Sequence, residues 1–191
     1  IRVRSKLAMA VATWSIVIAD ARTKEVAVGT VTCLTGLDLL AVVPVVVVGE
    51  GAAACQAAGD FNGVRRPIIA AGLEQDRAPA AILLSLSGVA GHAARQYGIV
   101  DTEGDAITFT GDSTLAWAGG VVGGDGDLTW AIQGNILVGP CVVDEIEAAM
   151  LATGGDMAER LMAGMEAARD AGGDGRCSCS GGDPTGCGCP P

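Results

Sequence analysis

The chain has 191 residues, of which 50% are hydrophobic and 3% aromatic, and its formal net charge is −10. This length and apolar content are enough for one compact domain whose core consists of closely spaced aliphatic layers. The negative charge repels phosphate backbones and argues against nucleic acid as a partner.

The first twelve residues have the character of a leader. Basic residues at positions 2, 4 and 6 precede the apolar stretch 7–12, and the small residues Ala10 and Ala12 are typical of a secretory cleavage site. Cleavage after Ala12 gives a chain that begins at Thr13. The alternative is an extra leading segment that stays in place. We predict a leader segment, residues 1–12, on a protein that is secreted or located in the periplasm or cell envelope.

A β-hairpin is predicted next, over residues 13–20 and 25–32. Both faces of its first strand carry apolar or small residues, which indicates a strand that is covered on both sides. Further β-structure is expected over 39–48 and 51–56, with Pro44 at an edge or bulge because proline cannot donate to a ladder. The run 39–48 is about half the length that a membrane helix needs, so no membrane span is expected.

Helices and strands then alternate in blocks. Pro67 and Pro79 each precede an apolar stretch in the position that suits the first turn of a helix. Strands follow, with Asp125-Gly126 as a hairpin signal between the last two. The strands are expected at 95–101, 106–109, 116–122 and 128–133.

Two amphipathic helices close the regular part. Their apolar stripes run over 142–150 and 157–168, and Asp156 with Glu159 forms a capping box before the second helix. The order strands, helices, strands, helices predicts an α+β protein with two sheets face to face and helices outside, a four-layer αββα sandwich. A three-layer α/β sandwich is the alternative.

The seven cysteines fall into two groups. Cys33, Cys55 and Cys141 lie within apolar segments, where single cysteines behave as small hydrophobic residues. The other four lie in a tail, residues 177–191, that is rich in Gly, Pro and Ser, which favours disulfides in an oxidising compartment over the alternative of a zinc site. They are Cys177, Cys179, Cys187 and Cys189.

An ordered series of segments carries a family resemblance from Thr13 to Arg176. The segments are 13–17, 95–101, 109–111, 117–119, 131–137, 158–162 and 171–176. In this series the chain resembles the domain of unknown function 1028 family, which is placed by fold in the N-terminal-nucleophile (Ntn) hydrolase superfamily. The resemblance implies an Ntn-hydrolase-like αββα domain over 13–176. It implies no substrate, because the activity of the family is largely unassigned.

Ntn hydrolases also suggest a role for Thr13. In such enzymes the hydroxyl of the first residue attacks an amide while its own α-amine takes the proton, and this chemistry needs a free terminus. The other interpretation of Thr13 is a β-favouring residue at the start of a strand. Gln133 and Asn135, expected just after a strand, are the candidates for stabilising an oxyanion, with an Asn-containing turn as the alternative.

Three further residues are candidates for ligand binding. Gln56 ends a buried strand, and Asp174 and Arg176 are close enough to form a carboxylate–guanidinium pair beside a pocket. The alternative for the pair is a surface salt bridge at a helix end. Cys55 has no base that the sequence places beside it, since the single histidine is His92. No metal site and no cofactor are expected.

Two functions of different classes follow. One is amide hydrolysis with Thr13 as a processed nucleophile, acting on a small-molecule or peptide ligand. The other is a non-catalytic binding or self-assembling protein, because sequences of the family continue into further strands where this chain has its Cys-rich tail. A homo-oligomer that covers an open sheet edge is therefore expected.

Overall fold

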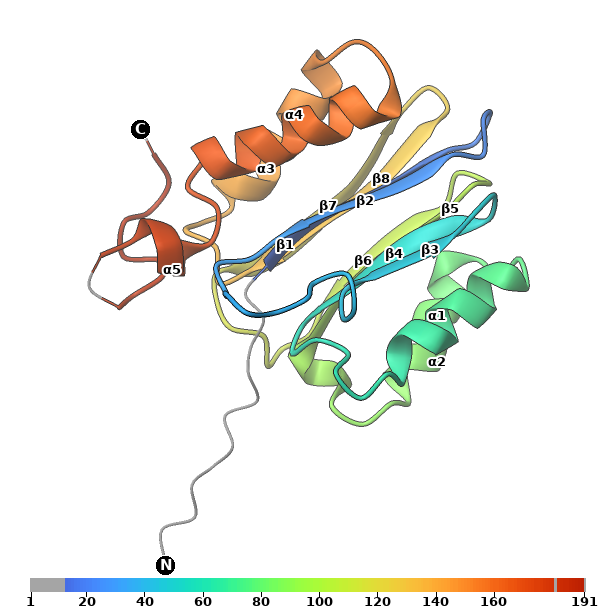
Figure 1. Ribbon diagram of the computed structural model, residues 1–191, viewed down its shortest axis with the longest axis horizontal. Helices are drawn as coiled ribbons and strands as arrows, with labels where there is room; N and C mark the ends of the chain where they lie inside the picture. Colours follow the sequence, from blue (N-terminus) through green and yellow to red (C-terminus); the bar gives the residue numbers. More distant parts are fainter. Residues whose placement is uncertain (1–12, 181, 191) are drawn as a thin grey trace, which may run out of the picture.

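Two four-stranded antiparallel sheets face each other in the computed structural model, which describes residues 13–180 and 182–190 (Figure 1). The predicted leader, residues 1–12, lies outside the described residues. The alternative of a three-layer sandwich on a single sheet is wrong, since the strands divide into two separate ladders.

The first sheet has the strand order β2-β1-β8-β7. Its strands are β1 (Thr13–Asp20), β2 (Val26–Val31), β7 (Ala118–Asp125) and β8 (Leu128–Asn135). β1 is central and pairs with β2 on one side and β8 on the other, and all eight of its residues are buried. The prediction that both faces of this strand are covered is therefore confirmed.

The second sheet has the strand order β3-β4-β5-β6. Its strands are β3 (Pro44–Val47), β4 (Gly51–Ala57), β5 (Arg95–Asp101) and β6 (Ala106–Thr110). The expected strand over 39–48 is shorter than predicted, because the carbonyl of Leu39 accepts the N–H groups of Val42 and Val43 in a turn. Pro44 begins the edge strand β3, where a missing N–H costs no ladder bond.

Helices cover the outer faces of both sheets (Figure 1). α1 (Arg65–Glu74) and α2 (Pro79–Ser87) pack on the second sheet, and α3 (Cys141–Ala152) and α4 (Met157–Asp170) pack on the first. A short helix η1 (His92–Ala94) precedes β5, and α5 (Gly175–Ser178) follows α4. The predicted capping box of Asp156 and Glu159 is present at α4. No helix within the described ranges is long and apolar enough to cross a membrane.

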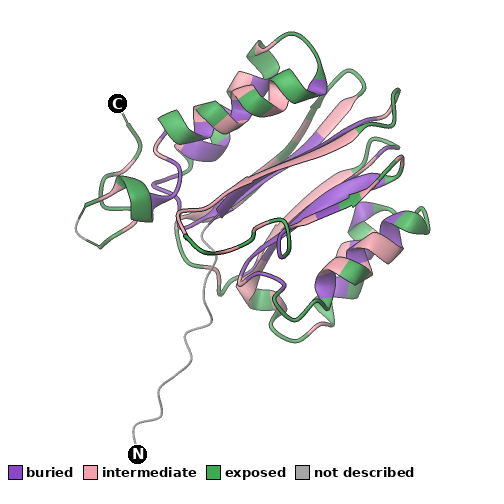
Figure 2. Cartoon of the chain, viewed as in Figure 1, coloured by how far each residue is buried: buried purple, intermediate pink, exposed green. Residues whose placement is uncertain are grey.

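The side chains between the two sheets are aliphatic along one part of the strands and polar along the other. One part is a buried aliphatic cluster that includes Val17, Ala19 and Val100. At the end where Thr13 begins β1, the residues that face the same space are polar and equally buried. Figure 2 shows the buried parts of the facing strands in purple. Since side chains alternate between the faces of a strand, Thr13 and Ser15 share the inward face with Val17 and Ala19.

Three disulfides join cysteines within the described residues. Each of the four tail cysteines takes part, but only one bond is internal to the tail. The pairs are Cys33–Cys177, Cys141–Cys189 and Cys179–Cys187. The interpretation of Cys33 and Cys141 as plain hydrophobic residues is wrong, because folding brings both next to the tail. Cys55 remains a free, buried thiol.

Candidate functional site

Six buried polar side chains meet between the sheets at the Thr13 end, each with at most 1% of its surface exposed. Because register places Thr13 opposite Asn135 and Ser15 opposite Gln133, all four lie on the inner face of the first sheet. Gln56 and Gln96 face them from paired positions of the second sheet. The six residues are Thr13, Ser15, Gln56, Gln96, Gln133 and Asn135.

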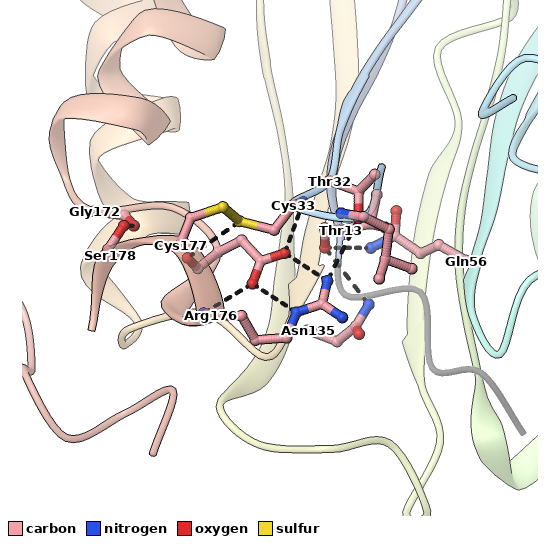
Figure 3. A network of polar contacts seen from close by, with 11 residues as sticks. Thr13, Thr32, Cys33, Gln56, Asn135, Gly172, Arg176, Cys177 and Ser178 are labelled. Carbon is pink, nitrogen blue, oxygen red and sulfur yellow. Dashed lines mark hydrogen bonds and ion pairs between the residues drawn. A yellow bond between two sulfur atoms is a disulfide. The ribbon is translucent and has the colours of Figure 1, made fainter. Parts of the chain in front are cut away.

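Gln56 is the centre of the hydrogen-bond network. Its amide nitrogen donates to the carbonyl oxygen of Thr13 at 3.0 Å and to Oε1 of Gln96 at 2.8 Å, and its own Oε1 accepts the hydroxyl of Ser15. The Asn135 amide nitrogen lies 3.5 Å from the same Thr13 carbonyl (Figure 3). It also lies 3.2 Å from Gln96 Oε1. Two amide side chains from opposite sheets therefore fix the backbone of Thr13.

Gln133 differs from its neighbours. Its side chain crosses the gap between the sheets and lies so close to Gly98 that a Cβ there would collide with it. Neither its amide oxygen nor its amide nitrogen makes a hydrogen bond within the described part of the chain. A buried amide without partners costs about 1–3 kcal/mol for each unpaired group, which a ligand that bonds to it would relieve.

Two backbone outliers border this network. Ala57, directly after Gln56, has φ of 69°, and Ile136, directly after Asn135, has φ of 55°. A β-branched residue in the left-handed region is a strained exception, and such strain concentrates at functional sites. Ile136 is held there because its N–H donates to the Leu115 carbonyl and its carbonyl accepts the N–H of Gly175.

Asp174 and Arg176 lie beside the network rather than inside it. Their bidentate pair has Nη2–Oδ2 at 2.7 Å and Nε–Oδ1 at 3.1 Å, and a second contact of Arg176 reaches the hydroxyl of Thr32 at 3.5 Å (Figure 3). The buried Asp174 carboxylate also accepts the backbone N–H of Cys33 at 3.0 Å. This carboxylate thus ties α5 to the segment after β2, and Arg176, with 27% of its side chain exposed, reaches solvent.

The family assignment agrees with this architecture. A family of unknown function (DUF1028) matches residues 13–182. The chain belongs to the DUF1028 family. It is also similar to the crystal structure of protein SPO2555 from Silicibacter pomeroyi, a DUF1028 match, with a TM-score of 0.73 and 25% sequence identity over 84% of this chain and 71% of that chain. No match was found among curated proteins.

Within this DUF1028 chain, the structure brings four of the sequence candidates into one network: Thr13, Gln56, Gln133 and Asn135. β8 extends two residues beyond the predicted end at Gln133 and includes Asn135, so the expectation that Asn135 follows the strand is wrong. Sequence reasoning missed Ser15 and Gln96 as site residues. Their signal was a polar side chain inside an otherwise apolar, buried strand, which becomes informative only once the partner strand is known.

Cys55 and His92 stay outside this site. Cys55 lies in the core beneath α1 and α2, on the other face of β4 from Gln56, and burial raises the pKa of its thiol to about 12. A thiol with that pKa is protonated at neutral pH and is no nucleophile. His92 lies in η1 and stacks on Phe109 with ring centroids 4.1 Å apart. No group of ligating residues within the described segments is arranged to hold a metal ion.

Replacing Gln56 by leucine is expected to lower the free energy of unfolding by about 3 kcal/mol, because it removes the donor to Thr13 and Gln96 and the acceptor of Ser15. Urea unfolding followed by circular dichroism measures this loss. Gln75→Leu, at an exposed position, is the matched control and should change stability by less than about 0.5 kcal/mol. Equal effects of the two substitutions would show that the buried network contributes no stability.

Proposed function

We propose that this protein is an amide hydrolase of the Ntn type, active in the form that begins at Thr13. One observation carries the proposal: Gln56 and Asn135, from two different sheets, both donate to the carbonyl oxygen of Thr13 within a buried polar network. A non-catalytic strand start needs no such arrangement of amides. The two sheets with their outer helices are also consistent with the four-layer αββα arrangement of the superfamily.

The chemistry follows from the free form of Thr13. Its hydroxyl oxygen bonds to the carbonyl carbon of the substrate amide, and the hydroxyl proton passes to the α-amine. The C–N bond then breaks, and the leaving amine takes that proton. A water molecule hydrolyses the resulting ester in the same way, releasing the acid and restoring the hydroxyl. Atoms and charges balance without a cofactor.

Neighbouring side chains supply the remaining roles. The amide of Gln133, which makes no hydrogen bond to any described residue, donates to the oxygen that becomes negative in the tetrahedral intermediate. Asn135 joins it by exchanging its 3.5 Å contact with the Thr13 carbonyl for this oxygen, and each such donor contributes about a hundredfold or more in rate. Gln56 binds and orients the Thr13 backbone. Arg176, held in place by the buried Asp174 carboxylate, offers a partly exposed polar contact for the substrate beside Thr32.

Covalent capture tests this proposal. A chain that begins at Thr13 is treated with a small alkyl β-lactone, whose ring opens on an activated hydroxyl and leaves the whole reagent attached as an ester. We expect peptide mass spectrometry to find one added reagent mass on the peptide that starts with Thr13. The matched control retains Ala12 before Thr13 and should stay unlabelled. Equal labelling of both chains, or none of either, contradicts the proposed nucleophile.

The proposed location is outside the cytoplasm, in the periplasm, cell envelope or medium. Disulfides persist in oxidising compartments, and two of the three bonds tie distant segments of the chain together. Processing after Ala12 during export would produce the free Thr13.

Self-assembly is the second candidate function, and it is favoured by the side of the molecule that is formed by the edge strands β2 and β3. The edge strands β2 and β3 lie next to each other there and carry no charged residue, and Val46 and Val48 are 52% and 88% exposed. A groove of about 560 Å³ runs between these strands and the start of α4. Uncharged edges without bulges are the ones that pair with another chain. A second copy of this chain is the proposed occupant.

Light scattering tests this candidate. We expect a dimer for the unmodified chain and a monomer for Val46→Lys, since a charge on an edge strand blocks pairing. Val122→Lys, at a half-exposed position of the opposite edge, is the control and should remain dimeric. A monomeric unmodified chain removes the candidate.

A further inference from the structure

A cluster of basic side chains surrounds one carboxylate at the start of α1, on the outer side of the second sheet. Asp60 follows β4, Arg65 and Arg66 begin α1, and Arg95 begins β5, where it pairs with Ala57. Because Gln96 faces the space between the sheets, its neighbour Arg95 faces the opposite way, toward the helices. The cluster is therefore separated from the Thr13 network by the sheet itself.

The carboxylate of Asp60 is already engaged by backbone groups. It accepts the N–H of Val64 at 3.3 Å, of Arg65 at 3.0 Å and of Arg66 at 2.9 Å, and so caps the first turn of α1. The two guanidinium groups approach it only to 3.7 Å from Arg65 Nη1 and 3.9 Å from Arg66 Nε. Neither distance makes a hydrogen bond, so the arginine N–H groups are left without that partner.

Several of these N–H groups have no acceptor. Arg65 is 1% exposed, and its guanidinium group donates from Nη2 to the carbonyl of Ala90, with the Tyr97 side chain close by. Its Nε and Nη1, together with Nε of Arg66 and Nε of Arg95, are buried and make no hydrogen bond to any described residue. Buried charged donors without acceptors are costly, because they have lost water and gained nothing in exchange.

The charges of the cluster do not balance. Three guanidinium groups and one carboxylate leave an excess of two positive charges, in a chain whose net charge is −10. Burial, followed by the charge of Arg65, lowers the pKa of Arg95, and the same two causes in the same order lower the pKa of His92. His92 is therefore neutral at pH 7, and Arg65 and Arg95 are near enough to repel each other.

We propose that this cluster, Arg65, Arg66 and Arg95 around Asp60, binds a tetrahedral oxyanion of the phosphate class. A dianion matches the excess of two positive charges, and four oxygens can accept N–H groups that approach from several directions. A carboxylate offers two oxygens in one plane and satisfies fewer of them. The anion reaches the cluster on the side of Arg66, whose side chain is 26% exposed.

Calorimetric titration with inorganic phosphate tests this site. In the unmodified protein, we expect saturable binding and a rise in melting temperature that sodium chloride at equal ionic strength does not reproduce. Phosphorus NMR gives the same answer without any variant, as line broadening of the phosphate signal. A simple alkyl phosphate monoester distinguishes a free phosphate site from one that takes a phosphorylated compound, and succinate tests the preference over carboxylates.

Substitutions locate the site. Arg66→Met and Arg95→Met, both at partly exposed positions, are each expected to weaken phosphate binding at least about tenfold, since each removes charge-assisted hydrogen bonds. Arg169→Met, at an exposed arginine paired with Asp170, should leave affinity within about twofold. Absence of phosphate binding, equal binding of succinate, or full affinity in both cluster variants would overturn the proposal. None of these outcomes depends on hydrolysis at Thr13.

Discussion

Replacing Thr13 by alanine in a chain that begins at that residue is expected to lower the rate of amide hydrolysis at least about a thousandfold. The hydroxyl is the atom that attacks, and no other group in the network takes its place: Ser15 is committed to Gln56. Release of 4-nitroaniline from acyl 4-nitroanilides measures the rate. Thr13→Ser keeps the hydroxyl and should retain activity within about tenfold.

A further variant separates catalysis from folding. Asn135→Ala removes one donor to the proposed oxyanion and is expected to lower kcat about a hundredfold with little change in KM. Because Asn135 also touches the Thr13 carbonyl, far-ultraviolet circular dichroism must show a folded chain before rates are compared. If Thr13→Ala retains the activity of the unmodified chain, hydrolysis is not carried out by this residue, whatever happens with Asn135.

Removing the Cys33–Cys177 disulfide, through Cys33→Ser with Cys177→Ser, is expected to lower the free energy of unfolding by about 5 kcal/mol. The bond closes a loop with a sequence separation of 144, so its loss returns a large amount of conformational freedom to the unfolded chain. Urea unfolding under non-reducing conditions measures the change. Amide exchange should also speed up around α5, since the same bond holds Asp174 against Cys33.

The matched control is the short bond between Cys179 and Cys187, with a sequence separation of 8. The same entropy argument predicts a loss of about 2.5 kcal/mol when both of these cysteines are replaced by serine. If removing either disulfide lowered the free energy of unfolding by the same amount, the stabilisation would depend on local contacts in the tail and not on loop length. Loss of the Cys33–Cys177 bond without any change in unfolding would contradict its stabilising role.

Much of the secondary structure could be predicted from neighbouring residues alone. β1 and β5 have the bounds that the sequence predicted, and the predicted capping box of Asp156 and Glu159 is present before α4. These features depend on residues within a few positions of each other. The segment 39–48 is the exception. Its apolar residues predicted a strand, but the N–H groups of Val42 and Val43 form a turn with the carbonyl of Leu39 and are not available for pairing with another strand.

The sequence by itself determined that Thr13 begins a buried strand, that two sets of strands alternate with helices, and that the tail is rich in cysteine. Only the tertiary structure decided that Gln56 and Gln96 meet Thr13 and Asn135, and that Cys33 and Cys141 pair with the tail. The physical reason is the sequence separation between the residues that interact. Periodicity and caps act between near neighbours, whereas these contacts join strands and loops whose proximity depends on the order of strands in two sheets and on how those sheets face each other.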